Sequence, residues 1–159
     1  VSFLYFKEQR CDIVLLECRM GGDLDATNII KNTLAAAFSS VSMDHMAFLG
    51  NTLQEIAHHK AGIIKPGAEI VSGVQQPEVL EILKRRAGEA ECRTVEKERL
   101  SHIKYGLEKQ RFDYLSSSGI LYRRLEISLA GVVQPENAAL AVEIVEALGR
   151  RDFPYRKSS

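Results

Sequence analysis

The chain has 159 residues, of which 45% are apolar and 26% charged, and its 21 basic groups balance 21 acidic ones. This composition predicts a folded domain with its own core and excludes the disordered and fibrous classes. A net charge of zero offers no general attraction to nucleic acid or to an acidic membrane surface. The three cysteines form no CxxC motif, so we expect a reducing cytoplasm and neither a disulfide framework nor a zinc ribbon.

The first expected element is a buried parallel strand over residues 11–17. These residues form a nearly continuous apolar, β-favouring run that ends at Glu17, and Gly21-Gly22 follow soon after. Glu17 would then lie at the carboxyl end of a strand, the edge where open α/β sheets place their ligands. Residues 25–28 are rich in capping and turn residues and predict a loop.

Residues 32–42 allow two interpretations. Three alanines favour a helix, whereas apolar residues that alternate with serines favour a second strand, which would end at Asp44-His45. We expect the strand.

A helix is expected to begin after Thr52, because Glu55 completes a capping box. Its apolar face has the spacing i, i+3, i+4, i+7 and comprises Leu53, Ile56, Ala57 and Lys60. This spacing predicts that Lys60 lies on the inward face of the helix.

The later elements are a strand over residues 69–74, a helix opened by Pro77, an antiparallel hairpin over residues 111–115 and 120–129, and a helix opened by Pro135 and ended by Gly149. Strand and helix alternate over the first half of the chain. The pattern predicts an α/β fold, with a mostly parallel sheet flanked by helices and an antiparallel β-hairpin appendage.

Three polar residues occupy positions where a core would place apolar ones: Glu17, His45 and Lys60. Each alone has an ordinary explanation as a solvated strand end, a loop residue or a lysine whose amine reaches water. Together, a carboxylate and an imidazole at neighbouring strand ends could bind one divalent cation. Desolvation favours the neutral amine of a lysine, which can add carbon dioxide to form an anionic carbamate suited to such a site.

These residues fall within a series of ordered motifs that resembles the central domain of the folylpolyglutamate synthase / dihydrofolate synthase family. That family consists of ATP-dependent amide ligases of the Mur ligase superfamily. The matching segments are Leu16-Glu17, Gly21-Gly22, Leu24-Asp25-Ala26-Thr27-Asn28, Asp44-His45, Leu49-Gly50, Ile56-Ala57, Lys60-Ala61-Gly62-Ile63-Ile64-Lys65 and Gln134-Pro135-Glu136-Asn137-Ala138-Ala139. Several motifs in the same order are far more specific than any single one.

The resemblance implies that ATP phosphorylates a substrate carboxylate and that the amino group of L-glutamate then displaces phosphate from the acyl phosphate. It further implies that Glu17 and His45 are Mg²⁺ ligands and that Lys60 is a carbamylated catalytic lysine.

Substrate contacts also follow from the resemblance. Leu24, Asp25 and Ala26 would line the pterin site for folate or dihydropteroate. Asn137 would contact ATP, through its side-chain amide against adenine.

The sequence departs from the family pattern near the candidate site. Cys18-Arg19 stands where Val-Gly is common, Asp23 stands where arginine precedes Leu-Asp-Ala, and His59 stands where glutamate often lies beside the lysine. The chain also lacks a G-x-x-G-x-G-K-[ST] loop, which the family needs to hold the ATP phosphates.

We therefore expect residues 1–150 to be part of a Mur-ligase-like central domain without its phosphate loop. Residues 151–159 would lead toward a C-terminal domain, and the chain alone would be inactive. Two alternatives are a cell-wall precursor Mur ligase and a non-catalytic remnant that serves as an interaction module. The motif over residues 24–28 favours folate over a muropeptide. We expect a cytoplasmic monomer that binds small molecules and neither nucleic acid nor membrane.

Overall fold

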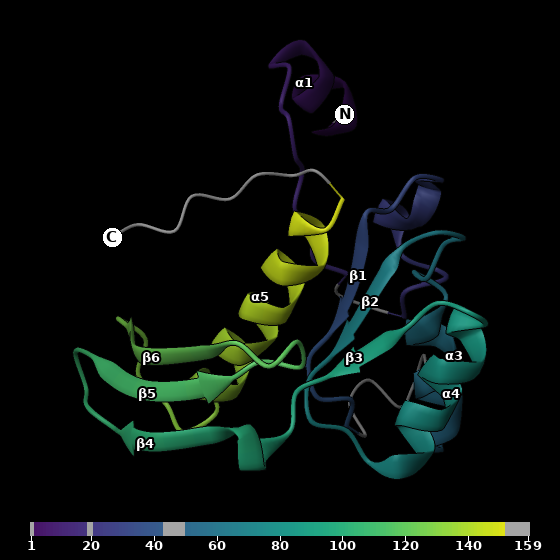
Figure 1. Cartoon of the computed structure of the whole chain (residues 1–159). Helices are drawn as coiled ribbons and strands as arrows, with labels where there is room; N and C mark the ends of the chain where they lie inside the picture. The colour runs from purple at the N-terminus through teal and green to yellow at the C-terminus, as the bar shows by residue number, and fades with distance from the viewer. Residues whose placement is uncertain (1, 19–20, 43–49, 152–159) are drawn as a thin grey trace.

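The computed structural model describes residues 2–18, 21–42 and 50–151. The elements in chain order are α1 (Ser2–Glu8), η1 (Ala26–Ile29), β1 (Ala35–Phe38), α3 (Leu53–Ala61), β2 (Glu69–Ser72), α4 (Pro77–Ala87), β3 (Cys92–Thr94), η2 (Lys97–Arg99), β4 (Leu100–Lys104), β5 (Gln110–Leu115), β6 (Leu121–Ile127) and α5 (Gln134–Gly149). They form a parallel sheet with the order β1-β2-β3 and an antiparallel sheet with the order β4-β5-β6 (Figure 1). The predicted α/β class is confirmed, and the expected hairpin is part of a three-stranded sheet.

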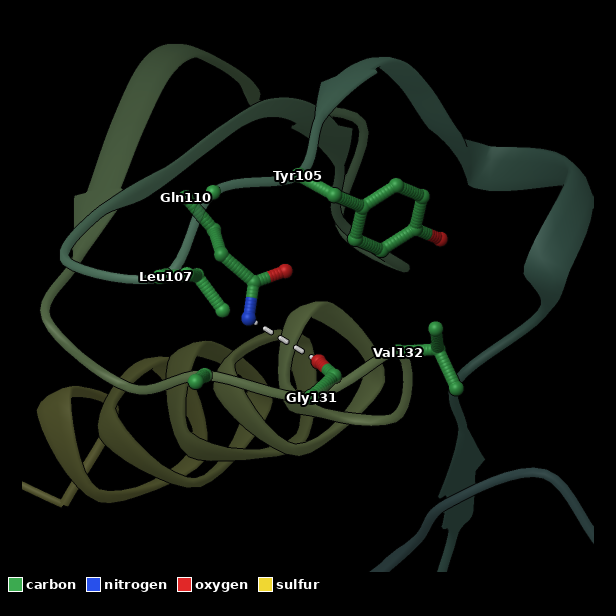
Figure 2. A pocket seen from close by; sticks show the side chains of 7 residues that line it. Tyr105, Leu107, Gln110, Gly131 and Val132 are labelled. Carbon is green, nitrogen blue, oxygen red and sulfur yellow. Dashed lines mark hydrogen bonds between the residues drawn. The ribbon is translucent and has the colours of Figure 1, made fainter.

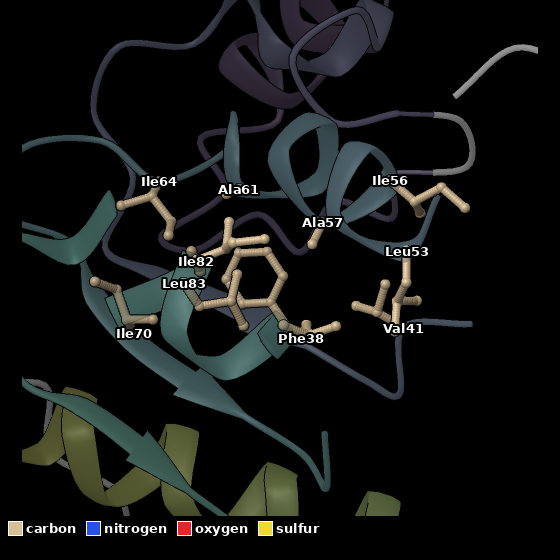
Figure 3. Packing of buried hydrophobic residues seen from close by; sticks show 12 residues of the cluster. Phe38, Val41, Leu53, Ile56, Ala57, Ala61, Ile64, Ile70, Ile82 and Leu83 are labelled. Atoms are coloured by element: carbon tan, nitrogen blue, oxygen red, sulfur yellow. The ribbon is translucent and has the colours of Figure 1, made fainter. Parts of the chain in front are cut away.

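Helices α3 and α4 cover one face of the parallel sheet. Each helix connects two neighbouring parallel strands, as a parallel pairing requires. Their apolar faces meet the strands in a cluster that includes Phe38, Ile56, Ile70 and Leu83, each at most 4% exposed. Figure 3 shows this cluster between strands and helices.

Helix α5 covers the other face and also packs against the antiparallel sheet. Its Ala139 and Leu140 belong to a second cluster that contains Val71 of β2 and Phe112 of β5. The helix therefore joins the two sheets.

The direction of α5 is opposite to that of the parallel strands. Near its start, Glu136 Oε1 lies 3.1 Å from the Nζ of Lys97, which follows β3. Just beyond its end, Arg151 Nε donates to Glu69 Oε1 of β2 at 2.9 Å. Because β2 begins at Glu69, the start of α5 lies at the carboxyl edge of the parallel sheet and its end at the amino edge.

The predicted strand over residues 11–17 is wrong. These residues have no regular secondary structure and are mostly exposed, with Leu15 96% exposed. β1 is an edge strand, and none of the described strands pairs with residues 11–17. A strand needs a neighbouring strand for its backbone hydrogen bonds. An apolar composition is therefore not sufficient to make residues 11–17 a strand.

The prediction of a strand within residues 32–42 is confirmed, although β1 is shorter than the pattern. The capping box of α3 is also confirmed: Thr52 Oγ1 accepts from Glu55 N, and Glu55 Oε2 accepts from Thr52 N, both at 3.2 Å. Hydrogen bonds from the backbone of Asn51 and from Thr52 lower the pKa of Glu55. Within the described ranges, no helix is long and apolar enough to span a bilayer.

Candidate functional site

The segment over residues 21–28, hereafter the docked loop, lies against the C-terminal end of α3. Gly22 has φ of +118°, and a Cβ at this position would lie 2.6 Å from the carbonyl oxygen of His59 and 2.9 Å from that of Lys60. Asp23 N donates to His59 O at 3.0 Å. Only glycine fits Gly22, because both the backbone angle and the close approach exclude a side chain.

Within the docked loop, Asp25 is the N-cap of η1. Its Oδ1 accepts from Thr27 N at 2.8 Å and from Thr27 Oγ1 at 2.6 Å. This capped turn leaves Leu24 74% exposed and Ile29 71% exposed. Two apolar side chains held on a fixed turn offer contact area to a flat apolar ligand.

Lys60 is in the last turn of α3 and is partly exposed. The predicted apolar face of α3 is buried at Leu53, Ile56 and Ala57, whereas Lys60 on the same face is only partly buried, and the neighbouring Ala61 is 2% exposed. The carbonyl oxygen of Lys60 lies on the helix turn that contacts the docked loop.

Glu17 lies beside the same loop, although not at a strand end. Its neighbour Cys18 places Sγ 3.2 Å from Thr27 Oγ1. Glu17 is exposed, so its carboxylate is accessible to a cation. His45 lies outside the described residues, as do Asp44 and Arg19.

Residues 2–18, 21–42 and 50–151 contain no group of three or more histidine, cysteine, aspartate or glutamate side chains that could hold a metal ion. The convergence of Glu17, His45 and Lys60 on one cation therefore remains a prediction.

Asn137 is exposed in the first turn of α5, where its Nδ2 donates to Gln134 Oε1 at 3.3 Å. The sheet separates it from Lys60, because α3 and α5 cover opposite faces. A ligand that contacts both residues would have to pass over the edge of the sheet.

A hollow of about 310 Å³ lies beside the loop that leads into α5 (Figure 2). Gln110, 1% exposed, lines it and donates from Nε2 to Gly131 O at 2.9 Å. Gln110 Oε1 has no hydrogen-bond partner within the described part of the chain. Sequence reasoning missed this residue, because a polar residue at the start of a strand usually faces water.

Two buried carboxylates on α5 were also missed. Glu143 is 0% exposed and accepts from Tyr114 OH at 2.7 Å and from Ser117 Oγ at 2.6 Å. Glu146 is 6% exposed and accepts from Ser118 Oγ at 2.6 Å and from Tyr122 OH at 2.8 Å. These bonds fasten the β5–β6 turn to α5.

The network shifts the acidity of its members. Burial by itself would raise the pKa of Glu146, but hydrogen bonds from Ser118 and Tyr122 outweigh it and lower that pKa. Burial, followed by the hydrogen bond to Glu143, raises the pKa of Tyr114. The phenol therefore stays protonated and acts as a donor.

Comparison with known proteins shows which family the chain belongs to. The profile of the Mur ligase middle domain matches residues 2–145. The chain belongs to the Mur ligase middle-domain family. Membership of this family accounts for both the ordered motifs in the sequence and the fold.

Individual relatives carry folate-related names. The chain is 34% identical to the dihydrofolate synthase/folylpolyglutamate synthase of Bacillus subtilis, over 97% of this chain and 36% of that protein. It is 35% identical to a folylpolyglutamate synthase of Arabidopsis thaliana, over 99% of this chain and 22% of that protein. The chain thus spans about a third or less of the length of these relatives.

Solved structures agree with the sequence comparisons. The apo form of L. casei FPGS superposes with a TM-score of 0.86 at 29% identity, over 98% of this chain and 38% of that one. A complex of FPGS with AMPPCP and folate gives the same TM-score and identity over the same shares. The predicted resemblance to folylpolyglutamate synthases is confirmed.

Proposed function

We propose that the chain is the central-domain portion of an ATP-dependent ligase that adds L-glutamate to folate or dihydropteroate. The observation that carries this proposal is the match to folate ligases over nearly the whole chain, in sequence and in fold. On this proposal residues 1–150 belong to the central domain, and residues 151–159 lead toward a further domain. The protein works as a cytoplasmic monomer and contacts only small molecules.

The reaction has two steps. A carboxylate oxygen of the pterin-bearing substrate attacks the γ-phosphorus of ATP, and the bond from that phosphorus to the bridging oxygen breaks, which releases ADP. The amino nitrogen of L-glutamate then attacks the carbonyl carbon of the acyl phosphate. Phosphate leaves with the electrons of its bond to carbon, the nitrogen loses a proton, and an amide remains.

The docked loop is the proposed pterin contact. Leu24 presents an exposed apolar side chain, and Asp25 fixes the turn through its two hydrogen bonds to Thr27. Ala26, the first residue of η1, is exposed beside them. Asn137 at the start of α5 is the proposed adenine contact, where its side-chain amide can both donate and accept.

Glu17 and His45 are the proposed ligands of Mg²⁺, which would neutralise phosphate charge in the reaction. The exposed Glu17 carboxylate fits this role, since oxygen ligands suit this cation. Lys60 is the proposed carbamate, and the residue is partly exposed. A carbamate would replace a positive charge by a negative one near the cation.

A chimera tests this proposal. Residues 1–159 replace the matched segment of the Bacillus subtilis relative, and ligation of glutamate to dihydropteroate, folate and a muropeptide is measured. We expect ligation of a pterin substrate. Ligation of muropeptide alone would support the cell-wall alternative, and a folded chimera without any ligation would support the non-catalytic remnant.

Lys60→Arg in the same chimera tests the carbamate. Arginine stays cationic and cannot add carbon dioxide, so we expect turnover to fall by about a hundred-fold or more, as when one group that stabilises the transition state is lost. Lys84→Arg on the exposed end of α4 is the matched control and should leave turnover unchanged. Unchanged turnover in Lys60→Arg would exclude the carbamate.

A further inference from the structure

Two side chains that are distant in sequence join the docked loop to α3. His59 Nδ1 lies 3.0 Å from both carboxylate oxygens of Asp23. The Oδ1 of Asp23 also accepts from Leu24 N at 2.8 Å. The same carboxylate therefore contacts the helix end and orients the first residue of the proposed pterin contact.

The backbone around this pair is closely packed. A Cβ on Gly62 would lie 2.3 Å from the Cβ of Asp23, so the residue after α3 leaves no space there. Asn28 Nδ2 reaches both Gly62 O and Asp23 O at 3.3 Å. The loop thus follows the end of α3, and the Asp23–His59 pair is a contact between ionisable side chains in this interface.

We infer that Asp23 and His59 are positioning residues that fix the docked loop, with Leu24, relative to Lys60. The inference rests on the proposed function for the meaning of that loop and that lysine. His59 directly precedes Lys60, and Asp23 directly precedes Leu24. The contact between Asp23 and His59 therefore limits how far Leu24 can move from Lys60.

The pair is partly exposed, with 33% of the His59 side chain and 42% of the Asp23 side chain accessible. Such pairs add little to global stability. The docked loop, however, has few buried side chains, so a small contribution decides how often it opens locally. Loss of the pair should therefore loosen the loop and leave the rest of the fold unchanged.

Hydrogen exchange on the 159-residue chain separates these effects. In His59→Ala, we expect amides of the docked loop, including Asp23 and Leu24, to exchange about two- to five-fold faster, the range for one exposed pair. The amides of Phe112 and Tyr114 in β5 should keep their rates. His59→Asn retains a donor where Nδ1 stands and should restore most of the protection.

His102→Ala is the matched control, because His102 Nδ1 lies 3.1 Å from Asp113 Oδ2 in another exposed pair. It should leave the docked loop unchanged. Unchanged exchange of the loop in His59→Ala, or an equal acceleration of loop and β5, would overturn the inference.

The KM values of the chimera add a measurement that general destabilisation of the fold would not change selectively. His59→Ala should raise the KM for the pterin substrate and leave the KM for ATP unchanged, since the proposed adenine contact lies on α5. Equal changes in both constants would contradict a positioning role. An inactive parent chimera would instead count against the proposed function, and the exchange experiment would still test the pair.

Discussion

The helices on the two faces of the parallel sheet are held by different forces. On the face of α3 and α4, apolar side chains such as Phe38 and Leu83 fill the interface. On the face of α5, the buried carboxylates of Glu143 and Glu146 lie close to an apolar cluster and bind hydroxyl groups of the β5–β6 hairpin. One face depends on contact area, and the other also depends on a few directional bonds. The two faces should therefore respond differently to substitution and to pH.

The largest effect is expected from Phe38→Ala. Phe38 is 4% exposed between β1 and the two helices, so its truncation leaves a cavity. We expect a loss of about 3–5 kcal/mol in the free energy of unfolding, measured by urea denaturation. A loss no greater than that of Leu107→Ala, where the side chain is 91% exposed, would contradict an apolar interface on this face.

Glu143→Ala should have the next largest effect. It leaves Tyr114 OH and the amide and hydroxyl of Ser117 without their acceptor in a buried site. We expect a loss of about 2–3 kcal/mol by the same measurement. Glu81→Ala, which breaks an exposed pair with Arg85, should change stability by less than about 0.5 kcal/mol. Equal losses for these two glutamates would remove the distinction between the faces.

Gly22→Ala should have an effect of similar size, but it acts at the candidate site. The added Cβ would meet the carbonyl oxygens of His59 and Lys60, whereas at Gly67 it meets no atom within 4 Å. Both glycines have positive φ, so both variants carry the backbone strain of about 1 kcal/mol. We expect Gly22→Ala to lose about 1–2 kcal/mol more than Gly67→Ala. Equal losses in the free energy of unfolding for the two variants would show that the docked loop moves away from α3 without a free-energy cost.

The smallest effect concerns pH and the α5 face. The folded-state pKa of Glu146 is lowered, so its contribution to stability is present above the ordinary glutamate pKa and is lost as pH falls through the lower, folded-state value. We expect the free energy of unfolding of the parent chain to decline more steeply below about pH 4.3 than that of Glu146→Gln. Parallel pH profiles would exclude a charged Glu146 from the hydrogen bonds between α5 and the β5–β6 hairpin.

Local signals predicted much of this fold. Thr52 and Glu55 lie within one turn of α3, and Pro77 alone marks the start of α4, so the printed sequence contains what these elements need. The turn over residues 116–119 likewise separates two strands that pair with each other. The strand predicted over residues 11–17 failed because its formation depends on a neighbour elsewhere in the chain.

The sequence predicted which residues belong to the candidate site better than it predicted how they are placed. The motif order identified the docked loop and Lys60, but the spacing rule did not show that Ala61 is the fully buried residue at the end of α3 while Lys60 is partly exposed. Glu143 and Glu146 resemble the solvent-facing glutamates of any helix until the hairpin hydroxyls are placed against them. The contact of Asp23 with His59 joins residues 36 positions apart, which no local pattern encodes.

The opposite course of α5 and the strands has a mechanical consequence. The helix is tied at one edge of the sheet through Lys97 and at the other through Glu69, and its middle is bound to the hairpin. A tilt of the hairpin would therefore tilt α5 about its middle. Asn137 at one end of the helix and Arg151 at the other would then move in opposite directions.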